Sequence, residues 1–465
     1  MATTTDSPAT AAVGTVAAPR PGRWIDDFDP EDSAQWETTG RPAARRNLAL
    51  SIVAEFLGFS VWQLWTIVTP SLGRAGFDLT ANQMFWLIAI PNLVGATLRF
   101  PYTFAVPRFG GRNWTIVSAL LLLVPCAGLA WVVQNPDTPF WLMCLVAATA
   151  GVGGGNFASS MANISFFYPE REKGAALGLN AAGGNLGVAV VQLAVPLVVI
   201  SGAGIALERA GIVFIPLVVL SAVLAWKHMD NLSSARADLA GYAAAVKDRH
   251  TWIVSFLYIG TFGSFIGYAG VFPTLIGRQF PEIAFTWSFI GLPGVPLTLA
   301  FLGALVGSLA RPYGGRVADR LGGARVSIAA YAVMVAGALG VVAALRSHSF
   351  ALFFGSFMVL FIATGMGNGS VYRMIPAIFR AGVDTSDRLA LTMAKREAAA
   401  CIGIAAGIGG YGGFLIPRGF AMSLTQFGSL APALLVFIGF YVVCIAVTWS
   451  CYLRRTGTRF ADAVV

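Results

Sequence analysis

Long runs of apolar residues dominate this chain, and short polar segments between them carry most of the charges. A membrane-spanning helix needs about 20 mostly apolar residues, and blocks of that length recur here, whereas the strands of a membrane β-barrel alternate apolar and polar residues. The pattern therefore predicts an all-α membrane protein with twelve transmembrane helices. We expect the spans at residues 47–73, 82–107, 113–134, 139–167, 173–201, 210–227, 250–277, 285–315, 325–345, 349–379, 389–417 and 428–453.

The composition excludes two other classes. Hydrophobic residues make up 56% of the 465 positions and charged residues only 11%, and the mean hydropathy is +0.71. A soluble domain carries about 25% charged residues, and a disordered chain needs low hydrophobicity. The 53 glycines suit helices that pack closely within a membrane.

Residues 1–46 form an N-terminal tail before the first span, and residues 454–465 form a C-terminal tail. The first 23 residues are rich in Ala, Thr and Pro, which predicts partial disorder. They lack the basic start and early apolar stretch of a signal peptide. The acidic stretch from Trp24 to Trp36 is predicted to be a solvated segment at the membrane surface, without an assigned function.

The basic residues are distributed unevenly between the two sides of the predicted bundle. Most of the 31 Lys and Arg residues fall in the two tails and the even-numbered loops. The positive-inside rule then places both termini in the cytoplasm, for a multi-pass protein of the cytoplasmic membrane. The net charge of +9 is interpreted as topology and contact with anionic lipid, not as a nucleic-acid site. The opposite side has only Arg74, Arg209, Arg278, Arg346 and Arg418.

Two halves of the chain resemble each other at a fixed offset of 212 residues. Arg99 matches Arg311, the pair Gly155-Asn156 matches Gly367-Asn368, and Arg108-Phe-Gly-Gly111 matches Arg320-Leu-Gly-Gly323. We therefore expect pseudo-symmetric six-helix halves at 47–227 and 250–453, joined by a cytoplasmic linker at 228–249. Parallel halves of this kind are the plan of the major facilitator fold, with the substrate site between them near the membrane midplane.

Arg99 and Arg311 are the main candidates for binding a substrate. A charge inside a span costs about 2.5–3.5 kcal/mol on insertion scales, so both side chains should face an internal cavity. Guanidinium donates two parallel hydrogen bonds to planar oxyanions. Pairing with acidic neighbours is the alternative, but only Glu55 and Glu397 fall within predicted spans, which favours anion binding. Arg373, late in its span, is predicted to act in gating.

Further candidates lie on the glycine-rich spans and near the loops. Asn185 is expected to donate to substrate oxygens, because an amide in hydrocarbon needs a partner. The rings of Phe157, Tyr268 and Phe272 are candidates for sandwiching a flat anion. Asp319, in the motif Gly315-Arg-Val-Ala-Asp319-Arg320-Leu-Gly322-Gly323, is expected to lock one conformation by pairing with an Arg or a helix N-terminus. Gating or conformational roles are also predicted for Gly151, Gly154, Asn156, Gly183, Gly367 and Asn368.

Other chemistries lack their residues. No GxxxxGK[ST] motif is present, so drive by ATP is not supported. The five cysteines fall in apolar stretches without a CxxC pair, and the three histidines stand at segment ends. We therefore predict no enzyme, no cofactor and no metal. A membrane redox enzyme or a sensor is the alternative from another class.

The motifs resemble the NarK-like nitrate/nitrite porter family of the major facilitator superfamily. The stretch from Ala150 to Pro169, continuing to Asn185, is similar to the first nitrate signature of that family, and Gly365 to Arg373 is similar to the second. The resemblance covers about residues 45–455. It implies a substrate held between two arginines, which match Arg99 and Arg311, with the signature Phe at Phe157 and the Asn at Asn185. Tyr268 and Phe272 match family positions less closely.

The resemblance implies nitrate and nitrite as substrates, in the context of nitrate assimilation. Like charges on two empty arginines would resist closure of the halves, so the loaded carrier should reorient more easily, which favours nitrate/nitrite antiport. The alternative is nitrate–proton symport, for which Glu55 and Glu397 are the possible coupling residues. A carrier of another small organic or inorganic anion is a further alternative. We expect a monomer in the lipid bilayer.

Overall fold

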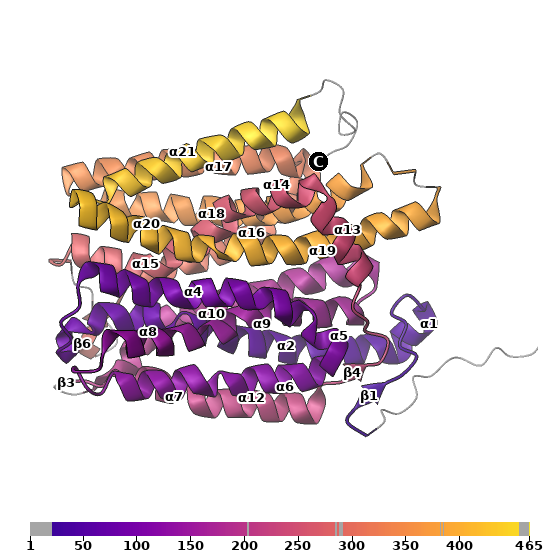
Figure 1. The fold of residues 1–465 in the computed structure, drawn as a ribbon, viewed down its shortest axis with the longest axis horizontal. Coiled ribbons are helices and arrows are strands. Elements are labelled where there is room, and N and C mark those ends of the chain that lie inside the picture. Colours follow the sequence, from indigo (N-terminus) through magenta and orange to yellow (C-terminus); the bar gives the residue numbers. More distant parts are fainter. Residues whose placement is uncertain are drawn as a thin grey trace, which may run out of the picture.

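The computed structural model describes residues 21–201, 204–283, 286–287, 292–381, 383–384, 386–454 and 465. The predictions for residues 1–20 and 455–464 therefore lie outside the described residues. Helices run roughly side by side along the length of the molecule, and the early helices form one bundle beside the later ones (Figure 1). The segment α13 and the strands β1 and β4 gather at one end, which we call the linker end.

The first bundle contains helices from the first half of the chain. They are α1 (Ser33–Gln35), η1 (Trp36–Gly40), α2 (Arg41–Trp62), α3 (Leu64–Val68), η2 (Thr69–Ser71), η3 (Gly73–Ala75), α4 (Ala81–Thr103), α5 (Ala105–Phe109), α6 (Gly111–Leu121), α7 (Leu123–Val132), α8 (Phe140–Thr149), α9 (Gly151–Phe167), α10 (Glu170–Val199), α11 (Arg209–Ile212) and α12 (Phe214–His228).

The linker and the second bundle follow. Their helices are α13 (Leu239–Lys247), α14 (Arg249–Tyr258), η4 (Ile259–Gly263), α15 (Ser264–Gln279), α16 (Ala300–Leu321), α17 (Gly323–Ser347), α18 (Phe350–Arg380), α19 (Arg388–Gly410), α20 (Gly412–Phe427), α21 (Ala431–Thr448) and η6 (Trp449–Leu453). Three short strand pairs lie outside the helices: β1 (Trp24–Ile25) with β4 (Asn231–Leu232), β2 (Ile200–Ser201) with β3 (Gly204–Ile205), and β5 (Thr286–Trp287) with β6 (Leu292–Pro296).

The helices account for the predicted membrane spans. Among the described residues, ten helical stretches are long and apolar enough to cross a membrane, and the bent pair α2 and α3 forms an eleventh. The helix α16, with 22 residues, has the length of a span but is not among these, because Arg311 and its other charged residues lower its hydropathy. The stretch Arg249–Gln279 is central, because 83% of its apolar window is buried, against 28% for the peripheral stretch Ala431–Leu453.

Two predicted boundaries were wrong, and one span predicted as continuous is broken. The first span breaks at Gln63 and bends by 42°. The eleventh continues through α20 to Phe427 instead of ending at residue 417. The eighth begins at Ala300 instead of residue 285, because the preceding segment forms β5 and β6. Pro293 and Pro296 lie in β6, and proline cannot donate the backbone hydrogen bond of a helix interior.

The repeat at an offset of 212 residues is visible in the backbone. Gly110 and Gly322 both adopt positive φ, 87° and 89°, and each begins the next long helix. This conformation favours glycine because it has no Cβ. The two glycines occupy equivalent turns between α5 and α6 in one bundle and between α16 and α17 in the other. The major facilitator fold predicted from the sequence is confirmed by these turns, by the helix count and by the structural neighbours reported below.

The prediction of a solvated N-terminal segment holds for Asp27, Asp29, Glu31 and Asp32, which are exposed. It was wrong for the apolar residues between them, which pack against the first bundle. Strand β1 pairs in parallel with β4 of the linker. Ile25, Phe28 and Trp36 are buried in a cluster with Phe167 and Tyr168. The apolar residues between the acidic ones provide this packing. The prediction considered only the acidic residues, which favour contact with water.

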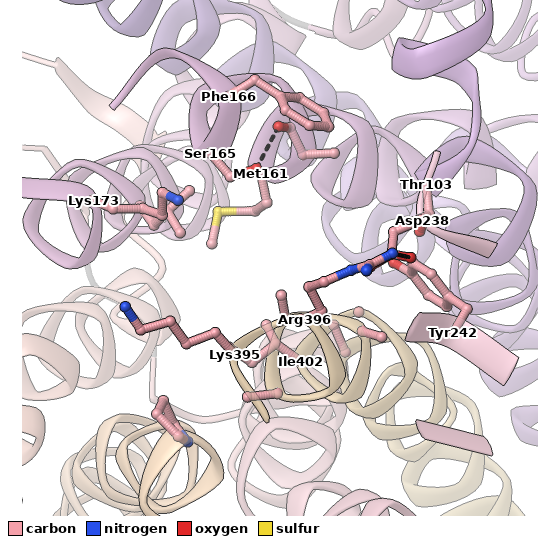
Figure 2. A pocket seen from close by; sticks show the side chains of 18 of the residues that line it. Thr103, Met161, Ser165, Phe166, Lys173, Asp238, Tyr242, Lys395, Arg396 and Ile402 are labelled. Atoms are coloured by element: carbon pink, nitrogen blue, oxygen red, sulfur yellow. Dashed lines mark hydrogen bonds and ion pairs between the residues drawn. The ribbon is translucent and has the colours of Figure 1, made fainter. Parts of the chain in front are cut away.

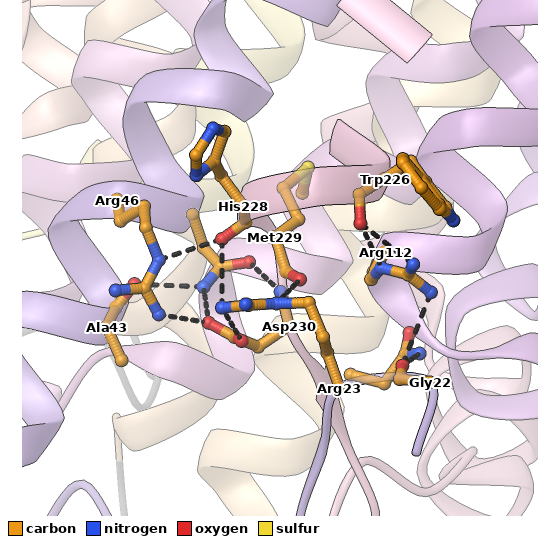
Figure 3. Close-up of polar contacts among 11 residues, drawn as sticks. Gly22, Arg23, Ala43, Arg46, Arg112, Trp226, His228, Met229 and Asp230 are labelled. Atoms are coloured by element: carbon orange, nitrogen blue, oxygen red, sulfur yellow. Dashed lines mark hydrogen bonds and ion pairs between the residues drawn. The ribbon is translucent and has the colours of Figure 1, made fainter. Parts of the chain in front are cut away.

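An ion cluster holds the same segment in place (Figure 3). Asp230 is fully buried and accepts hydrogen bonds from Arg23 at 2.6 Å and Arg46 at 2.5 Å, and also from Asn47. Arg112 donates to the Trp226 carbonyl at 2.8 Å. Because Asp230 follows the last helix of the first bundle, these contacts join the beginning of that bundle to its end.

Candidate functional site

Arg99 and Arg311 lie inside the protein, as predicted, one in each bundle. Arg99 on α4 is 1% exposed and Arg311 on α16 is 9% exposed. Neither forms an ion pair within the described ranges. The alternative in which both arginines pair with acidic neighbours is therefore not observed.

Arg99 connects the two bundles. Its Nε donates to the Gly154 carbonyl on α9 at 3.1 Å, and its Nη1 donates to the Ala406 carbonyl on α19 at 2.6 Å. The guanidinium carbon lies 4.9 Å from the ring centres of both Phe157 and Phe262. A guanidinium between aromatic faces is stabilised electrostatically without a counter-ion.

Arg311 has fewer contacts. Its Nη2 donates to the Tyr258 hydroxyl at 3.3 Å, and its guanidinium carbon lies 5.1 Å from the Tyr372 ring centre. Tyr258 stacks on Phe262 with ring centres 5.2 Å apart. The stacked pair of Phe262, which lies against Arg99, and Tyr258, which contacts Arg311, therefore connects the two arginines.

Several buried polar atoms around these arginines lack a partner in the part of the chain that the structure describes. They include Arg99 Nη2 and Arg311 Nη1. On α10, both side-chain polar atoms of the predicted substrate residue Asn185 also lack a partner among the described residues. An unpaired buried donor is costly unless something else accepts from it. Two guanidinium donors are thus available to an anion that binds between the bundles.

Glycine permits close contact between helix backbones in both bundles, between α9 and α2 in the first and between α18 and the arginine helix α16 in the second. A Cβ added to Gly153 on α9 would lie 2.1 Å from the Gly58 carbonyl oxygen. A Cβ added to Gly365 on α18 would likewise lie 2.1 Å from the Gly307 carbonyl oxygen. Positions 153 and 365 differ by 212 residues, so both bundles use glycine at the same point of the repeat to let backbones approach.

The structure places two predicted aromatic residues away from the arginines. The Tyr268 hydroxyl bonds to the Tyr441 hydroxyl at 2.6 Å, and Phe272 packs on Phe357 with ring centres 4.6 Å apart. Both lie in the aromatic core of the second bundle. The rings that reach the arginines from the same span are Tyr258 and Phe262, which the sequence analysis missed.

The physical reason for this error lies in η4, a π-helical turn at Ile259–Gly263. A π turn inserts an extra residue, so the faces before and after it are rotated relative to an ideal helix. Trp62 and Tyr372 were also missed; each lies against an arginine guanidinium. Tyr372 directly precedes Arg373 in the second signature, and that adjacency was an available signal.

The predicted gating residues lie at helix contacts. Gly151 and Gly154 on α9 face α4 and Trp62, Gly183 on α10 faces Ile52, and Gly367 on α18 faces Thr261. Asn156 accepts from Ser159, and Asn368 is buried on α18. Asp319 pairs with Arg373, joining α16 to α18 at the linker end.

The two predicted coupling carboxylates differ in their surroundings. Glu55 on α2 is fully buried, and neither carboxylate oxygen has a hydrogen-bond partner among the described residues. It lies close enough to Arg99 for electrostatic interaction. Glu397 is half-buried in the linker-end part of α19.

A cavity of about 950 Å³ reaches from the linker end to the arginine site. Phe157, Tyr372 and Ala406 line its inner part, and these same residues contact the arginines. Lys173 and Lys395 extend into it from opposite walls (Figure 2). At its mouth, basic side chains outnumber acidic ones, which favours entry of an anion.

The linker helix α13 contacts both bundles beside this mouth. Arg396 on α19 donates to Asp238 at the start of α13, and this hydrogen bond lowers the pKa of the Asp238 carboxyl. Tyr242 on α13 packs on Phe104, which lies between α4 and α5, with ring centres 5.1 Å apart. Burial raises the pKa of the Tyr242 hydroxyl, so it stays neutral.

At the opposite end the bundles are in direct contact. Arg418 on α20 lies 3.9 Å from the Trp86 ring centre on α4 and donates to Asn82 at 2.8 Å. Gln192 on α10 donates to the Ala269 carbonyl on α15 at 2.8 Å. The arginine site is therefore reached from the linker end and covered at the other.

No group of three or more His, Cys, Asp or Glu side chains that could hold a metal ion occurs within the described residues. Two helix bundles with a buried cationic site between them, and a cavity that reaches it from one end, are the arrangement of a secondary transporter.

The comparisons with known proteins agree. Residues 48–417 match the model of the Major Facilitator Superfamily. The chain is 40% identical over 454 residues to the nitrate/nitrite transporter NarU of Escherichia coli (strain K12), which covers 92% of this chain and 96% of that relative. It is 35% identical over 457 residues to the probable nitrate/nitrite antiporter NarK2 of Thermus thermophilus, covering 93% and 97%. The chain belongs to the Major Facilitator Superfamily and, within it, to the family of these transporters.

Solved structures support the fold. The xylose transporter XylE from E. coli, in a partially occluded inward-open conformation, superposes with a TM-score of 0.62 at 14% identity, over 88% of this chain and 99% of that one. At this identity the likeness concerns the fold alone.

Proposed function

We propose that this protein transports nitrate and nitrite across the cytoplasmic membrane, as an exchanger that holds one anion between Arg99 and Arg311. The relatives carry these substrates in their names, and the identity to them extends over almost the whole chain. The observation that carries the proposal is the pair of buried guanidiniums, each with a donor that lacks a partner among the described residues.

The geometry suits a small planar oxyanion. Arg99 Nη2 and Arg311 Nη1 donate to its oxygens, since charge-assisted bonds to a planar anion are the strong ones. The flat faces of Phe157 and Phe262 bound the space beside Arg99 and disfavour bulky substrates. Asn185 supplies a further polar group from α10, and Tyr258 keeps Arg311 oriented.

Transport then proceeds by rocking of residues 47–227 against residues 250–453. The cavity at the linker end corresponds to the inward-facing state, with both termini and the linker in the cytoplasm, and the protein works as a monomer. The glycine contacts at Gly151, Gly154, Gly183 and Gly367 let the helices slide. The pair Asp319–Arg373 stabilises one of the two states.

Exchange follows from the charges. Two buried guanidiniums without an anion repel one another, because like charges interact strongly where water is excluded. The empty carrier therefore reorients slowly, and the loaded carrier reorients quickly. Nitrate–proton symport is the second candidate, favoured by the unpaired carboxylate of Glu55 inside the first bundle.

The test uses proteoliposomes loaded with nitrite, with nitrate added outside and a pH dye inside. Exchange predicts nitrate uptake only when nitrite or nitrate is inside, without net proton movement. Uptake into empty vesicles with internal acidification would instead establish symport. Formate, bicarbonate and phosphate are added as competitors, and equal inhibition by any of them would overturn the assignment of nitrate and nitrite.

A further inference from the structure

We propose that Glu55 is a proton-binding site linked to the arginine site, so that the carrier takes up a proton when nitrate binds. This inference rests on the proposed function, because it concerns an anion bound beside Arg99. It goes further by assigning a second ligand, the proton, and the residue that holds it.

The first observation is burial without a partner. Glu55 is 0% exposed, and neither carboxylate oxygen accepts a hydrogen bond of normal geometry among the described residues, although the Ser160 hydroxyl lies beside it. A buried carboxylate without donors is strongly disfavoured in its charged form. Carboxyl groups within membrane spans are rare and mark ion or proton paths.

The second observation is the polar group beside it. Ser160 on α9 bonds to Ser51 at 2.9 Å and accepts from Asn180 Nδ2 at 2.6 Å. The Oδ1 atom of Asn180 has no donor either. Acceptors therefore exceed donors in this group, and one proton on Glu55 adds a donor. Met161, next to Ser160 on α9, and Leu177, one turn before Asn180 on α10, line the cavity, so this polar group lies close to the cavity wall.

The third observation is the charge that faces Glu55. From α4 the facing charge is Arg99, and Arg311 on α16 lies beyond it. Helix α9 carries no charged residue. Helix α10 faces Glu55 with Gly184, where an added Cβ would lie 2.8 Å from the Glu55 Cγ.

The remaining titratable groups on packed elements lie elsewhere. Those of α10 are in its first turn, and those of α12 are at its last turn. The phenols of Tyr258 and Tyr372 belong to the surroundings of Arg99 and Arg311. Arg99 is thus the charge that Glu55 and a bound anion share.

Because Glu55 and the bound anion interact with the same guanidinium, the protonation of Glu55 affects the binding of nitrate. An ionised Glu55 repels an incoming anion and partly neutralises Arg99. A protonated Glu55 does neither. Nitrate therefore binds more tightly at lower pH, and its binding draws a proton onto Glu55, as thermodynamic linkage requires.

The linkage also connects the two transport modes. If nitrate and nitrite both carry the proton across, exchange moves no net proton. If the carrier returns empty, it releases the proton with nitrate, and transport becomes nitrate–proton symport. One residue thus supports both modes without a second coupling site.

Calorimetric titration of the purified full-length protein with nitrate tests this proposal. Titrations in two buffers of different ionisation enthalpy give the number of protons taken up per nitrate, across about pH 5 to 9, a range that covers documented buried carboxyl groups. The wild type should take up as much as one proton, and its Kd should rise with pH, by at most about tenfold per pH unit for one linked proton. Glu55→Gln should bind nitrate with a pH-independent Kd and no proton uptake.

Glu397→Gln is the matched control, because it removes the other carboxyl within the spans predicted from the sequence, and it should behave as the wild type. Proton uptake retained in Glu55→Gln would overturn the proposal. So would the absence of proton uptake in the wild type over the whole range, a result that needs no variant. If nitrate fails to bind at every pH, the two-arginine site itself fails, and the linkage with it. Binding without linkage would leave the transport function standing.

Discussion

The two arginines occupy equivalent positions of the repeat, yet their surroundings differ. Arg99 is fixed by two backbone carbonyls, one from each bundle, and by three aromatic rings. Arg311 is held by one phenol at 3.3 Å and one ring, and it is more exposed. A repeated sequence has therefore produced one rigid and one adaptable donor. We infer that Arg99 is the anchor across the bundles and that Arg311 follows the substrate.

The largest expected effect comes from replacing either arginine by lysine. Lysine lacks the planar fork, and a hydrogen bond to a charged group contributes about 1.5–3 kcal/mol, so exchange should fall by roughly 10- to 100-fold. Arg99→Lys should lose more than Arg311→Lys, because it also loses the carbonyl of Ala406. Nitrite efflux driven by external nitrate measures both, and elution as a single species by gel filtration controls for folding. Normal exchange by Arg311→Lys would contradict the proposal that the anion is held between the two arginines.

The next prediction asks whether the two halves are equivalent in packing. Gly153→Ala and Gly365→Ala each place a Cβ 2.1 Å from a facing carbonyl oxygen. Overpacking of this kind costs about 1–3 kcal/mol, so both variants should melt at lower temperature by similar amounts. Gly178→Ala and Gly355→Ala are the matched controls, since an added Cβ there meets nothing within 4 Å. Unequal losses would show that the packing, like the arginine surroundings, is asymmetric.

A smaller effect separates the two tyrosines of the seventh span. Tyr258→Phe removes the hydroxyl that accepts from Arg311 but keeps the ring stack on Phe262. KM for nitrate should rise by roughly 10-fold, the lower limit for a hydrogen bond to a charged group, because this bond is long at 3.3 Å. Tyr268→Phe removes a bond to Tyr441 in the aromatic core, so stability should fall while KM stays unchanged. A raised KM in Tyr268→Phe with an unchanged KM in Tyr258→Phe would instead place Tyr268 in the substrate site. It would also contradict the role of Tyr258 in holding Arg311.

The smallest effect concerns the linker end, where α13 bridges the bundles. Because the hydrogen bond from Arg396 lowers the pKa of Asp238, this pair stabilises the observed state above the ordinary Asp pKa. The contribution is lost as pH falls through the lowered value. Asp238→Asn should therefore change the exchange rate slightly at neutral pH and have no effect at acid pH. High salt should mimic the variant, since exposed pairs are screened. An effect that grows at acid pH would contradict this sign.

The sequence predicted most of the spans and both arginines, because apolar runs and an isolated charge inside them are strong signals. It also predicted the seventh span, but it chose the wrong aromatic residues within it, because the π turn at Ile259–Gly263 changes which rings face the arginines. Hydrophobic periodicity cannot reveal a π turn in a helix that is buried on all sides. It also missed Trp62, since an indole within an apolar span has no distinguishing pattern. The unpaired state of Glu55 depends on distances between three helices, which no local pattern encodes.

The N-terminal segment has a consequence for synthesis of the chain. Arg23 and Asp230 lie 207 residues apart in sequence, and the strands β1 and β4 pair only when both have been made. At about 5–20 residues per second, the segment waits roughly 10 to 40 s for its partner. During that time Trp24 and Ile25 have no strand to pair with. The contacts between the N-terminal segment and the linker can therefore form only when the linker leaves the ribosome, just before the second bundle is synthesised.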